Sequence, residues 1–103
     1  MYTRNVVLRK SNRAGKKFKV ILTKKSGATK TVHFGASGYS DFTKHKDPAR
    51  MRRYSARHKS RENWTKSGMD TAGFWSKWIL WSKPSLKGAI KYTENRFGLK
   101  ITS

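Results

Sequence analysis

Arginine and lysine side chains crowd one short segment of this sequence. Six cations lie between positions 50 and 61: Arg50, Arg52, Arg53, Arg57, Lys59 and Arg61. A guanidinium group presents a planar fork of donors that suits the oxygens of phosphate. Glu62 is the one acid close by, so pairing within the segment cannot neutralise this charge. We therefore expect an anion-binding surface here, with an ordinary solvated helix face as the alternative.

A second group of cations crowds the first thirty residues. We assign Lys16, Lys17, Lys19, Lys24 and Lys25 of this group to the same anion-binding function. Lysines on a sheet also protect its edges from aggregation, but the group is larger than that role requires. Contacts of this kind position a phosphate backbone without reading its sequence. The segment 47–60 also lacks the Asn and Gln side chains that read bases.

Catalytic and metal-binding chemistry is poorly supplied. His33, His45 and His58 are the only histidines, and the acids that flank His45 have no ligand spacing. There is no cysteine, no Gly-rich phosphate loop and no nucleophile elbow. We predict no enzyme, no cofactor, no metal and no small-molecule substrate. A nuclease that uses Asp41 and His45 is the distant alternative.

Composition sets the class of partner. The chain has 103 residues with 25 Lys and Arg against 5 Asp and Glu, a formal charge of +20. Such a charge favours association with nucleic acid, an anionic membrane surface or an acidic protein. Aromatic residues make up 13% of the chain, which indicates a folded domain and not a disordered tail. The first ten residues contain no apolar stretch typical of a signal peptide.

Alternating and helical patterns predict the elements that position these residues. Residues 5–9, 16–24 and 29–34 read as strands of a three-stranded antiparallel meander, with Phe18, Val20 and Leu22 on the apolar face. Lys17 and Lys19 fall on the opposite, solvated face. We predict a single small α+β domain, in which the meander (1–35) packs against about three helices (36–103). Residues 99–101 could add a short strand beside it.

Capping residues place the helices. Asp47 followed by Pro48 predicts a helix start, and that helix runs to about Lys59. Ser85 and Gly98 delimit a last helix that ends at Phe97. Between these two helices, residues 71–83 are predicted to form a further helix, which Pro84 ends. Tyr39 and Phe42 are expected to pin the loop 39–46 to the core.

The tryptophan-rich helix at 71–83 is the expected centre of the core. Helical spacing puts its apolar side chains on one arc and leaves Ser76, Lys77 and Leu80 on the other side. That arc consists of Phe74, Trp75, Trp78, Ile79 and Trp81. The alternative is that one or two indoles stay exposed, to stack on bases or to anchor a partner. The candidate aromatic anchors are Trp64, Trp75, Trp78 and Trp81.

Short motifs in the order seen here resemble a small basic protein family of the nucleocytoplasmic large DNA viruses, the giant viruses. The resemblance extends over about two thirds of the chain, from His33 onward, and the motifs are His33-Phe-Gly-Ala36, Gly38-Tyr-Ser-Asp41, His45-Lys-Asp47, Tyr54-Ser-Ala-Arg-His-Lys59, Arg61-Glu-Asn-Trp64, Thr71-Ala-Gly-Phe-Trp75, Leu80-Trp81 and Arg96-Phe-Gly98. The resemblance implies a non-enzymatic protein of the virus particle, with the host cytoplasm or nucleus as the place of assembly. We therefore expect a structural protein of the minor-capsid kind.

The partners implied are capsid proteins or other acidic virion proteins, viral nucleic acid and the anionic inner membrane. The alternative function is a sequence-nonspecific DNA- or RNA-binding protein that compacts or escorts the viral genome. Family analogy alone does not choose between these functions.

Overall fold

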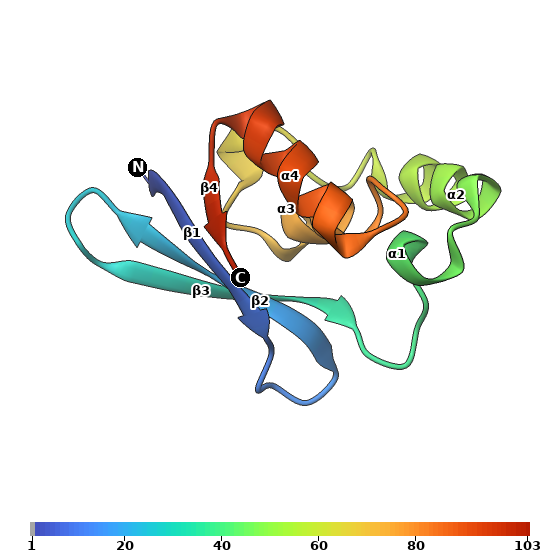
Figure 1. The fold of residues 1–103 in the computed structure, drawn as a ribbon, viewed down its shortest axis with the longest axis horizontal. Helices are drawn as coiled ribbons and strands as arrows, with labels where there is room; N and C mark the ends of the chain where they lie inside the picture. The colour runs from blue at the N-terminus through green and yellow to red at the C-terminus, as the bar shows by residue number, and fades with distance from the viewer. Residues whose placement is uncertain (1) are drawn as a thin grey trace.

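The computed structural model describes residues 2–103, which form a four-stranded sheet with the helices gathered on one side of it (Figure 1). The predicted α+β class is confirmed. In chain order the elements are β1 (Tyr2–Lys10), β2 (Lys16–Lys24), β3 (Thr29–Ala36), α1 (Phe42–His45), α2 (Pro48–His58), the 3-10 turn η1 (Lys66–Gly68), α3 (Ala72–Trp75), the π-helical turn η2 (Ser76–Leu80), α4 (Leu86–Phe97) and β4 (Lys100–Thr102).

The sheet has the order β3-β2-β1-β4. The first three strands form the predicted antiparallel meander, but β4 returns from α4 to pair with β1 in parallel, so the whole sheet is mixed. Alternation along β2 puts Val20 and Leu22 in the core, and β3 contributes Val32 and Phe34 from the same face. The other face of the sheet has no helix against it (Figure 1).

The capping residues read from the sequence set the helix boundaries. The carboxylate of Asp47 accepts hydrogen bonds from the first turn of α2, at 3.0 Å from the amide nitrogen of Ala49. Ser85 Oγ accepts from the amide of Gly88 at 3.0 Å at the start of α4. Gly98 ends α4 with a φ of 66°, a left-handed conformation that glycine adopts without strain.

The segment formed by α3 and η2 lies directly on the apolar face of the sheet. Phe74, Trp75 and Ile79 are completely buried, as predicted. Leu80 was placed on the outer side of a regular helix, and this is wrong, because it is 2% exposed. The π-turn rotates less per residue than an α-helix. It therefore carries Leu80 into the buried arc and turns Trp81 outward, and the segment ends at Leu80 instead of continuing to Lys83.

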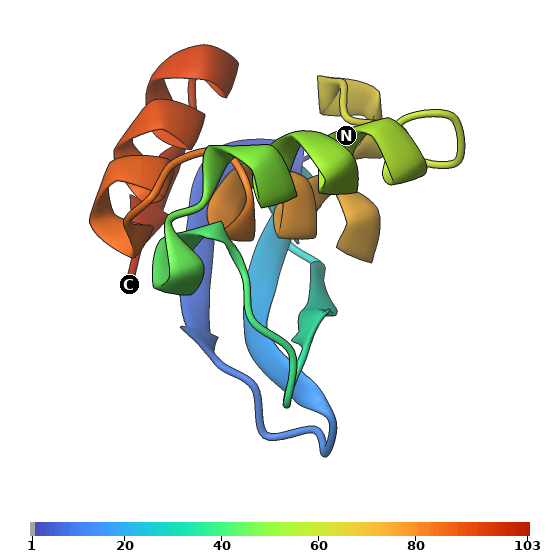
Figure 2. The ribbon, with the colours of Figure 1, turned by 90° about the vertical axis from the view of Figure 1, so that its right-hand side faces the viewer.

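Aromatic stacking holds α2 on the outer side of this segment. The ring of Tyr54 lies parallel to the ring of Trp81, with centroids 4.2 Å apart and an interplanar angle of 2°. On its other face Tyr54 stacks on His58, also at 4.2 Å. The hydroxyl of Tyr54 donates to Ser76 Oγ at 3.2 Å. Figure 2 shows the resulting order, with α2 in front of the α3–η2 segment and the strands behind.

The loop before α1 is pinned by one aromatic residue and not by two. Phe42 is buried, as expected, whereas Tyr39 is 73% exposed. Gly38 precedes Tyr39 with a φ of 87°, and the turn there points the tyrosine away from the core. The prediction that Tyr39 anchors this loop is therefore wrong.

Truncation of Leu80 tests the π-turn. Leu80→Ala is expected to lower the free energy of unfolding by about 2–5 kcal/mol, because it removes a fully buried side chain and leaves a cavity. Urea unfolding followed by tryptophan fluorescence measures the change.

Leu86→Ala is the matched control for this prediction. Leu86 is only partly buried, so the same truncation should cost less. A loss below about 0.5 kcal/mol for Leu80→Ala, the size typical of a surface substitution, would place Leu80 on the outside of the segment and contradict the π-turn.

Candidate anion-binding surface

The predicted cations at positions 50–61 lie on α2 and on the residues that follow it. Arg50, Arg52, Arg53 and Arg57 are exposed on the helix, and Lys59 and Arg61 are exposed just beyond it. None of the six makes an ion pair with any acid among residues 2–103. The side chains that the sequence grouped together are thus grouped in space, at the end of the molecule that carries α2 (Figure 1).

The acids explain why these cations remain unpaired. The sequence contains five acids, and each is engaged elsewhere in the fold. The carboxylate of Glu62 accepts from Trp64 Nε1 at 2.8 Å and meets His58 Nδ1 at 3.0 Å. Glu94 accepts from the amide of Ile101 at 2.8 Å and so joins α4 to β4. Asp47 caps α2, Asp41 pairs with Lys17, and Asp70 lies 3.8 Å from Lys30.

Lys17 does not lie on the solvated face where the sequence placed it. Its ammonium group is 2.6 Å from the carboxylate of Asp41, and the two side chains are only 13% and 2% exposed. The chain folds back after β3 and brings Asp41 over this end of β2. Asp41 is held further by hydrogen bonds from the backbone amide and hydroxyl of Thr43. Lys17 is therefore committed to the fold and is not available to an external anion.

The remaining predicted lysines do not join the α2 surface. Lys24 and Lys25 are exposed at the β2–β3 turn. In Figure 1 this turn and α2 lie at opposite ends of the longest axis of a body that measures 41 × 28 × 26 Å. Lys16 and Lys19 lie near the other end of β2, beside the turn that joins it to β1. The predicted cations are therefore divided among separate surfaces, a division that the sequence analysis does not predict.

Two of the four predicted aromatic anchors are core residues. Trp75 is 0% exposed and Trp78 is 8% exposed, so neither ring can stack on a base or a partner. Their indole nitrogens donate to backbone carbonyls, Trp75 to Met69 at 2.6 Å and Trp78 to Trp64 at 3.0 Å. Trp64 and Trp81 are partly buried and pack against the core. The largely exposed aromatic side chain among residues 2–103 is Tyr39, contrary to the prediction that it packs on the core.

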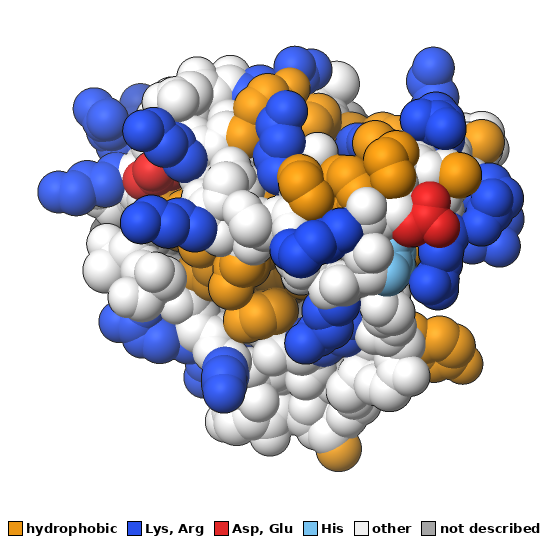
Figure 3. Space-filling view, turned by 45° about the vertical axis from the view of Figure 1, so that its right-hand side comes forward, with side chains coloured by type: hydrophobic (Ala, Val, Ile, Leu, Met, Phe, Trp, Pro, Cys, Tyr) orange, Lys and Arg blue, Asp and Glu red, His pale blue; other side chains and the backbone are white. Residues whose placement is uncertain are grey.

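Lys77 and Arg96 lie over tryptophan rings where these rings approach the surface. Lys77 Nζ lies 4.9 Å from the centre of the Trp64 ring and donates to Ser55 Oγ at 3.0 Å. Burial, followed by the charge of Arg96, lowers the pKa of Lys77 below its usual value. The guanidinium of Arg96 lies 4.7 Å from the Trp78 ring. Figure 3 shows the result on one face, where Lys and Arg side chains surround apolar patches and acidic side chains are few.

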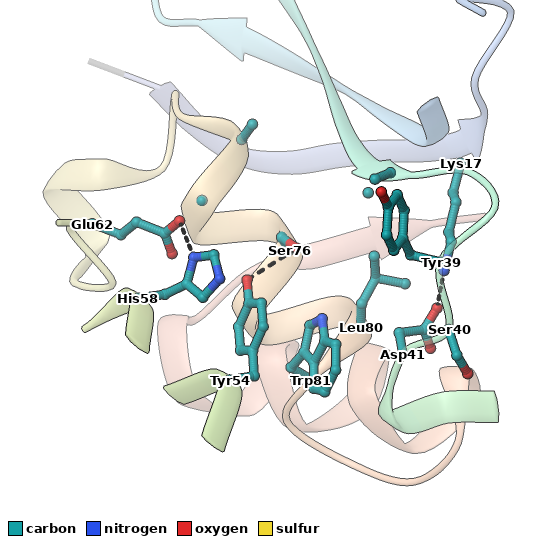
Figure 4. A pocket seen from close by; sticks show the side chains of 14 residues that line it. Lys17, Tyr39, Ser40, Asp41, Tyr54, His58, Glu62, Ser76, Leu80 and Trp81 are labelled. Atoms are coloured by element: carbon teal, nitrogen blue, oxygen red, sulfur yellow. Dashed lines mark hydrogen bonds and ion pairs between the residues drawn. The ribbon is translucent and has the colours of Figure 1, made fainter. Parts of the chain in front are cut away.

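A groove of about 400 Å³ lies between α2 and the loop that follows β3. Figure 4 shows that its polar lining consists mainly of pairs, with Lys17 on Asp41, His58 on Glu62 and Tyr54 on Ser76. Burial raises the pKa of Tyr54 to about 12, so its hydroxyl stays protonated and acts as a donor. These polar groups already satisfy one another. The groove therefore offers a partner a concave surface with the exposed Tyr39 at its rim, and little free charge.

The residues named for the nuclease alternative do not form a shared site. Asp41 is held by Lys17, and His45 Nδ1 accepts from the amide of Asp47 at 3.0 Å. Residues 2–103 contain no group of three or more His, Cys, Asp or Glu side chains placed to hold a metal ion. In the same part of the chain no helix has the length and apolar character needed to cross a membrane.

Fold and surface together define a small α+β protein in which the six cations on and after α2 have no acidic partner among residues 2–103. Residues 6–58 match the model of a family described as "Family of unknown function (DUF5754)". This match covers more than half of the chain, so the protein belongs to that family. No curated protein and no solved structure matches the chain. The resemblance to a giant-virus family is not tested by these comparisons and stays a prediction.

Removal of the buried carboxylate tests the ion pair beneath the groove. Asp41→Ala is expected to lower the free energy of unfolding by about 3–5 kcal/mol, because it leaves the ammonium of Lys17 buried without a partner. Addition of Lys17→Met to this variant should restore part of the loss. Chemical denaturation of the three proteins measures the effect.

Asp70→Ala provides the control, since its pair with Lys30 is 46% and 41% exposed and is expected to contribute less than about 1 kcal/mol. Equal losses for the two aspartates would contradict a structural role for the Lys17–Asp41 pair.

Proposed function

We propose that this protein is a non-enzymatic structural protein that acts by holding anionic partners against its cationic surface, as a minor capsid protein of a large DNA virus particle would. One observation carries the proposal. Each of the five acids is engaged elsewhere, Asp70 through an exposed pair with Lys30, and the six cations of α2 and the following residues have no internal counter-charge among residues 2–103. An external anion is therefore the natural partner of this surface.

The distribution of charge supports a linking role. Exposed cations lie at the β2–β3 turn and on α2, at opposite ends of the long axis (Figure 1). A small rigid body with such ends can contact two neighbours at once. Acidic shell proteins are the first partners we propose, with the viral genome and the inner membrane surface as further polyanions in the particle. The virion is the corresponding location, with assembly in the host cytoplasm or nucleus.

Partly exposed aromatic groups favour a protein partner. Tyr39 stands 73% exposed at the rim of the groove beside α2. Exposed tyrosine and arginine side chains are both enriched at the energetic centres of protein interfaces. A partner with acidic groups around an apolar pocket would match this surface.

Sequence-nonspecific binding of nucleic acid is the second candidate function. The observation that favours it is the row formed by Arg50, Arg53 and Arg57, all exposed on α2. A helix of this kind can contact successive phosphates, and it lacks base-reading side chains. In this function the protein compacts or escorts the viral genome.

Salt dependence distinguishes the two functions. If the protein binds nucleic acid, replacement of Arg50, Arg53 and Arg57 by Gln should reduce the slope of log K against log salt by about 3, because each lost phosphate contact removes about one released counterion. Fluorescence anisotropy with a random-sequence duplex at several salt concentrations measures the slope.

The control removes the same charge elsewhere, with Lys87, Lys91 and Lys100 replaced by Gln on α4 and β4, where all three are exposed. Equal changes for both triple variants would contradict a role for α2. A shallow slope for the unmodified protein would exclude genome binding. Failure of the α2 variant to weaken binding to acidic virion proteins would then exclude the shell function.

A further inference from the structure

The face of the sheet that no helix covers carries a row of basic residues. In the strand registers Arg9 of β1 lies opposite Lys19 of β2, and Lys19 lies opposite His33 of β3. These residues alternate with Leu8, Val20 and Val32, which are buried on the helix side. Like charges placed directly opposite each other on a sheet are destabilising. Arg9 relieves part of this repulsion because its guanidinium donates to the carbonyl of Leu8 at 2.9 Å and reaches the carbonyl of Thr102 at 3.3 Å.

The turn between β1 and β2 adds further groups to this end of the face. Ser11 Oγ lies 2.7 Å from His33 Nδ1 and also accepts from the amide of Arg13 at 3.0 Å. The amide of Lys16 donates to the carbonyl of Arg13 at 3.2 Å, which closes the turn. The turn is therefore fixed against His33 by hydrogen bonds, and it holds two exposed cations near the imidazole.

The electrostatic state of His33 reflects this arrangement. Partial burial, followed by the charges of Arg13, Lys19 and Lys16, lowers its pKa below the usual 6.5. No acid acts on His33 from β2, β3 or the turn. The imidazole thus lies in a positive field that nothing within residues 2–103 neutralises.

We propose that Ser11, Arg13, Lys16, Lys19 and His33 form a binding site for a phosphate group. The guanidinium and the two ammonium groups supply charge. The protonated imidazole can donate from Nδ1 to Ser11 Oγ and from Nε2 to a phosphate oxygen. The phosphate can belong to a nucleic-acid backbone, to a lipid headgroup or to a free phosphate ester. This site deepens the proposed function, because it names the chemistry of one anionic partner. It lies on β2, β3 and the β1–β2 turn and not on α2, so an experiment can disprove the site without disproving the proposed function.

Binding at this site should depend on pH with a defined sign. A phosphate next to His33 favours the imidazolium, so the pKa of His33 rises when phosphate binds. For a phosphodiester, whose own charge is constant in this range, affinity must then increase by linkage as the pH falls through the pKa values of His33 in the bound and free protein. Neutral His33 at higher pH leaves only the three cations to hold the ligand.

NMR titration of the histidine side chains in the full-length protein tests the site. The probe is inorganic phosphate, with chloride at equal ionic strength as the reference, and the midpoint for His33 should rise by about 1 pH unit. The effect should disappear when Arg13, Lys16 and Lys19 are replaced by Gln. It should persist when Lys24 and Lys25 are replaced instead, and also in the α2 triple variant, which isolates this site from the proposed function.

Three further probes identify the source of the phosphate: a 12-base-pair duplex, vesicles that contain a phosphatidic acid lipid, and a poly-glutamate peptide. A rise in the His33 midpoint with duplex assigns the site to nucleic acid, and a rise with vesicles assigns it to a membrane surface. No rise with inorganic phosphate, duplex or vesicles, or a rise with poly-glutamate alone, overturns the proposal. Equal loss in the Lys24 and Lys25 variant overturns it too, since only general charge would then matter.

Discussion

Repulsion among the cations is the constraint on which the rest of this structure depends. A chain with a formal charge of +20 opposes its own compaction. Apolar burial must therefore supply the stability, and large side chains packed closely in the core provide this burial. Phe74, Trp75 and Ile79 of the segment between the sheet and α4 have no exposed surface, and the ring of Phe74 packs against Phe97 of α4. Side chains of this size each remove a large apolar area from water.

The same constraint explains the placement of the few acids. Most of them are used to satisfy buried or backbone polar groups of the fold. Asp47 satisfies the free amides at the start of α2, and Glu94 ties the short strand β4 to α4. Asp41 accompanies the one lysine that the fold buries most deeply beside the groove. Acids that are engaged in the fold cannot neutralise cations on the surface. The structural use of the few acids therefore leaves the exterior strongly cationic.

Local signals made most of the fold predictable from the sequence. Alternation gave the three strands, and Asp47, Ser85 and Gly98 gave the helix boundaries because caps act on the nearest backbone groups. A short strand at 99–101 beside the meander could be expected, but not its pairing with β1 or its parallel direction. The π-turn could not be predicted, because periodicity assumes a constant rotation per residue. A constant rotation places Trp81 on the buried arc and Leu80 outside it, whereas Leu80 is buried and Trp81 is only partly buried.

The candidate surfaces were predictable only in part, for a related reason. Charge can be read residue by residue, and the α2 cations are exposed as expected. Long-range pairing cannot be read in this way. Lys17 meets an aspartate 24 residues away, and His33 meets a serine 22 residues away. Sequence spacing therefore predicts Lys17 as a binding residue and predicts no role for Ser11. The division of the lysines between two ends of the molecule also follows from topology, which spacing does not contain.

Binding and folding are coupled in a molecule built this way. An anion that binds the folded state and not the unfolded chain stabilises the fold in proportion to the logarithm of its concentration. Here the anion would also relieve repulsion that the free protein must bear, most directly where Arg9 and Lys19 lie opposite each other on the open face. The apolar core gives the free protein its shape, and the cations on α2, at the β2–β3 turn and on the sheet gain their favourable energy only when a partner is present. Stability in the bound state is then a property of the assembly more than of the isolated domain.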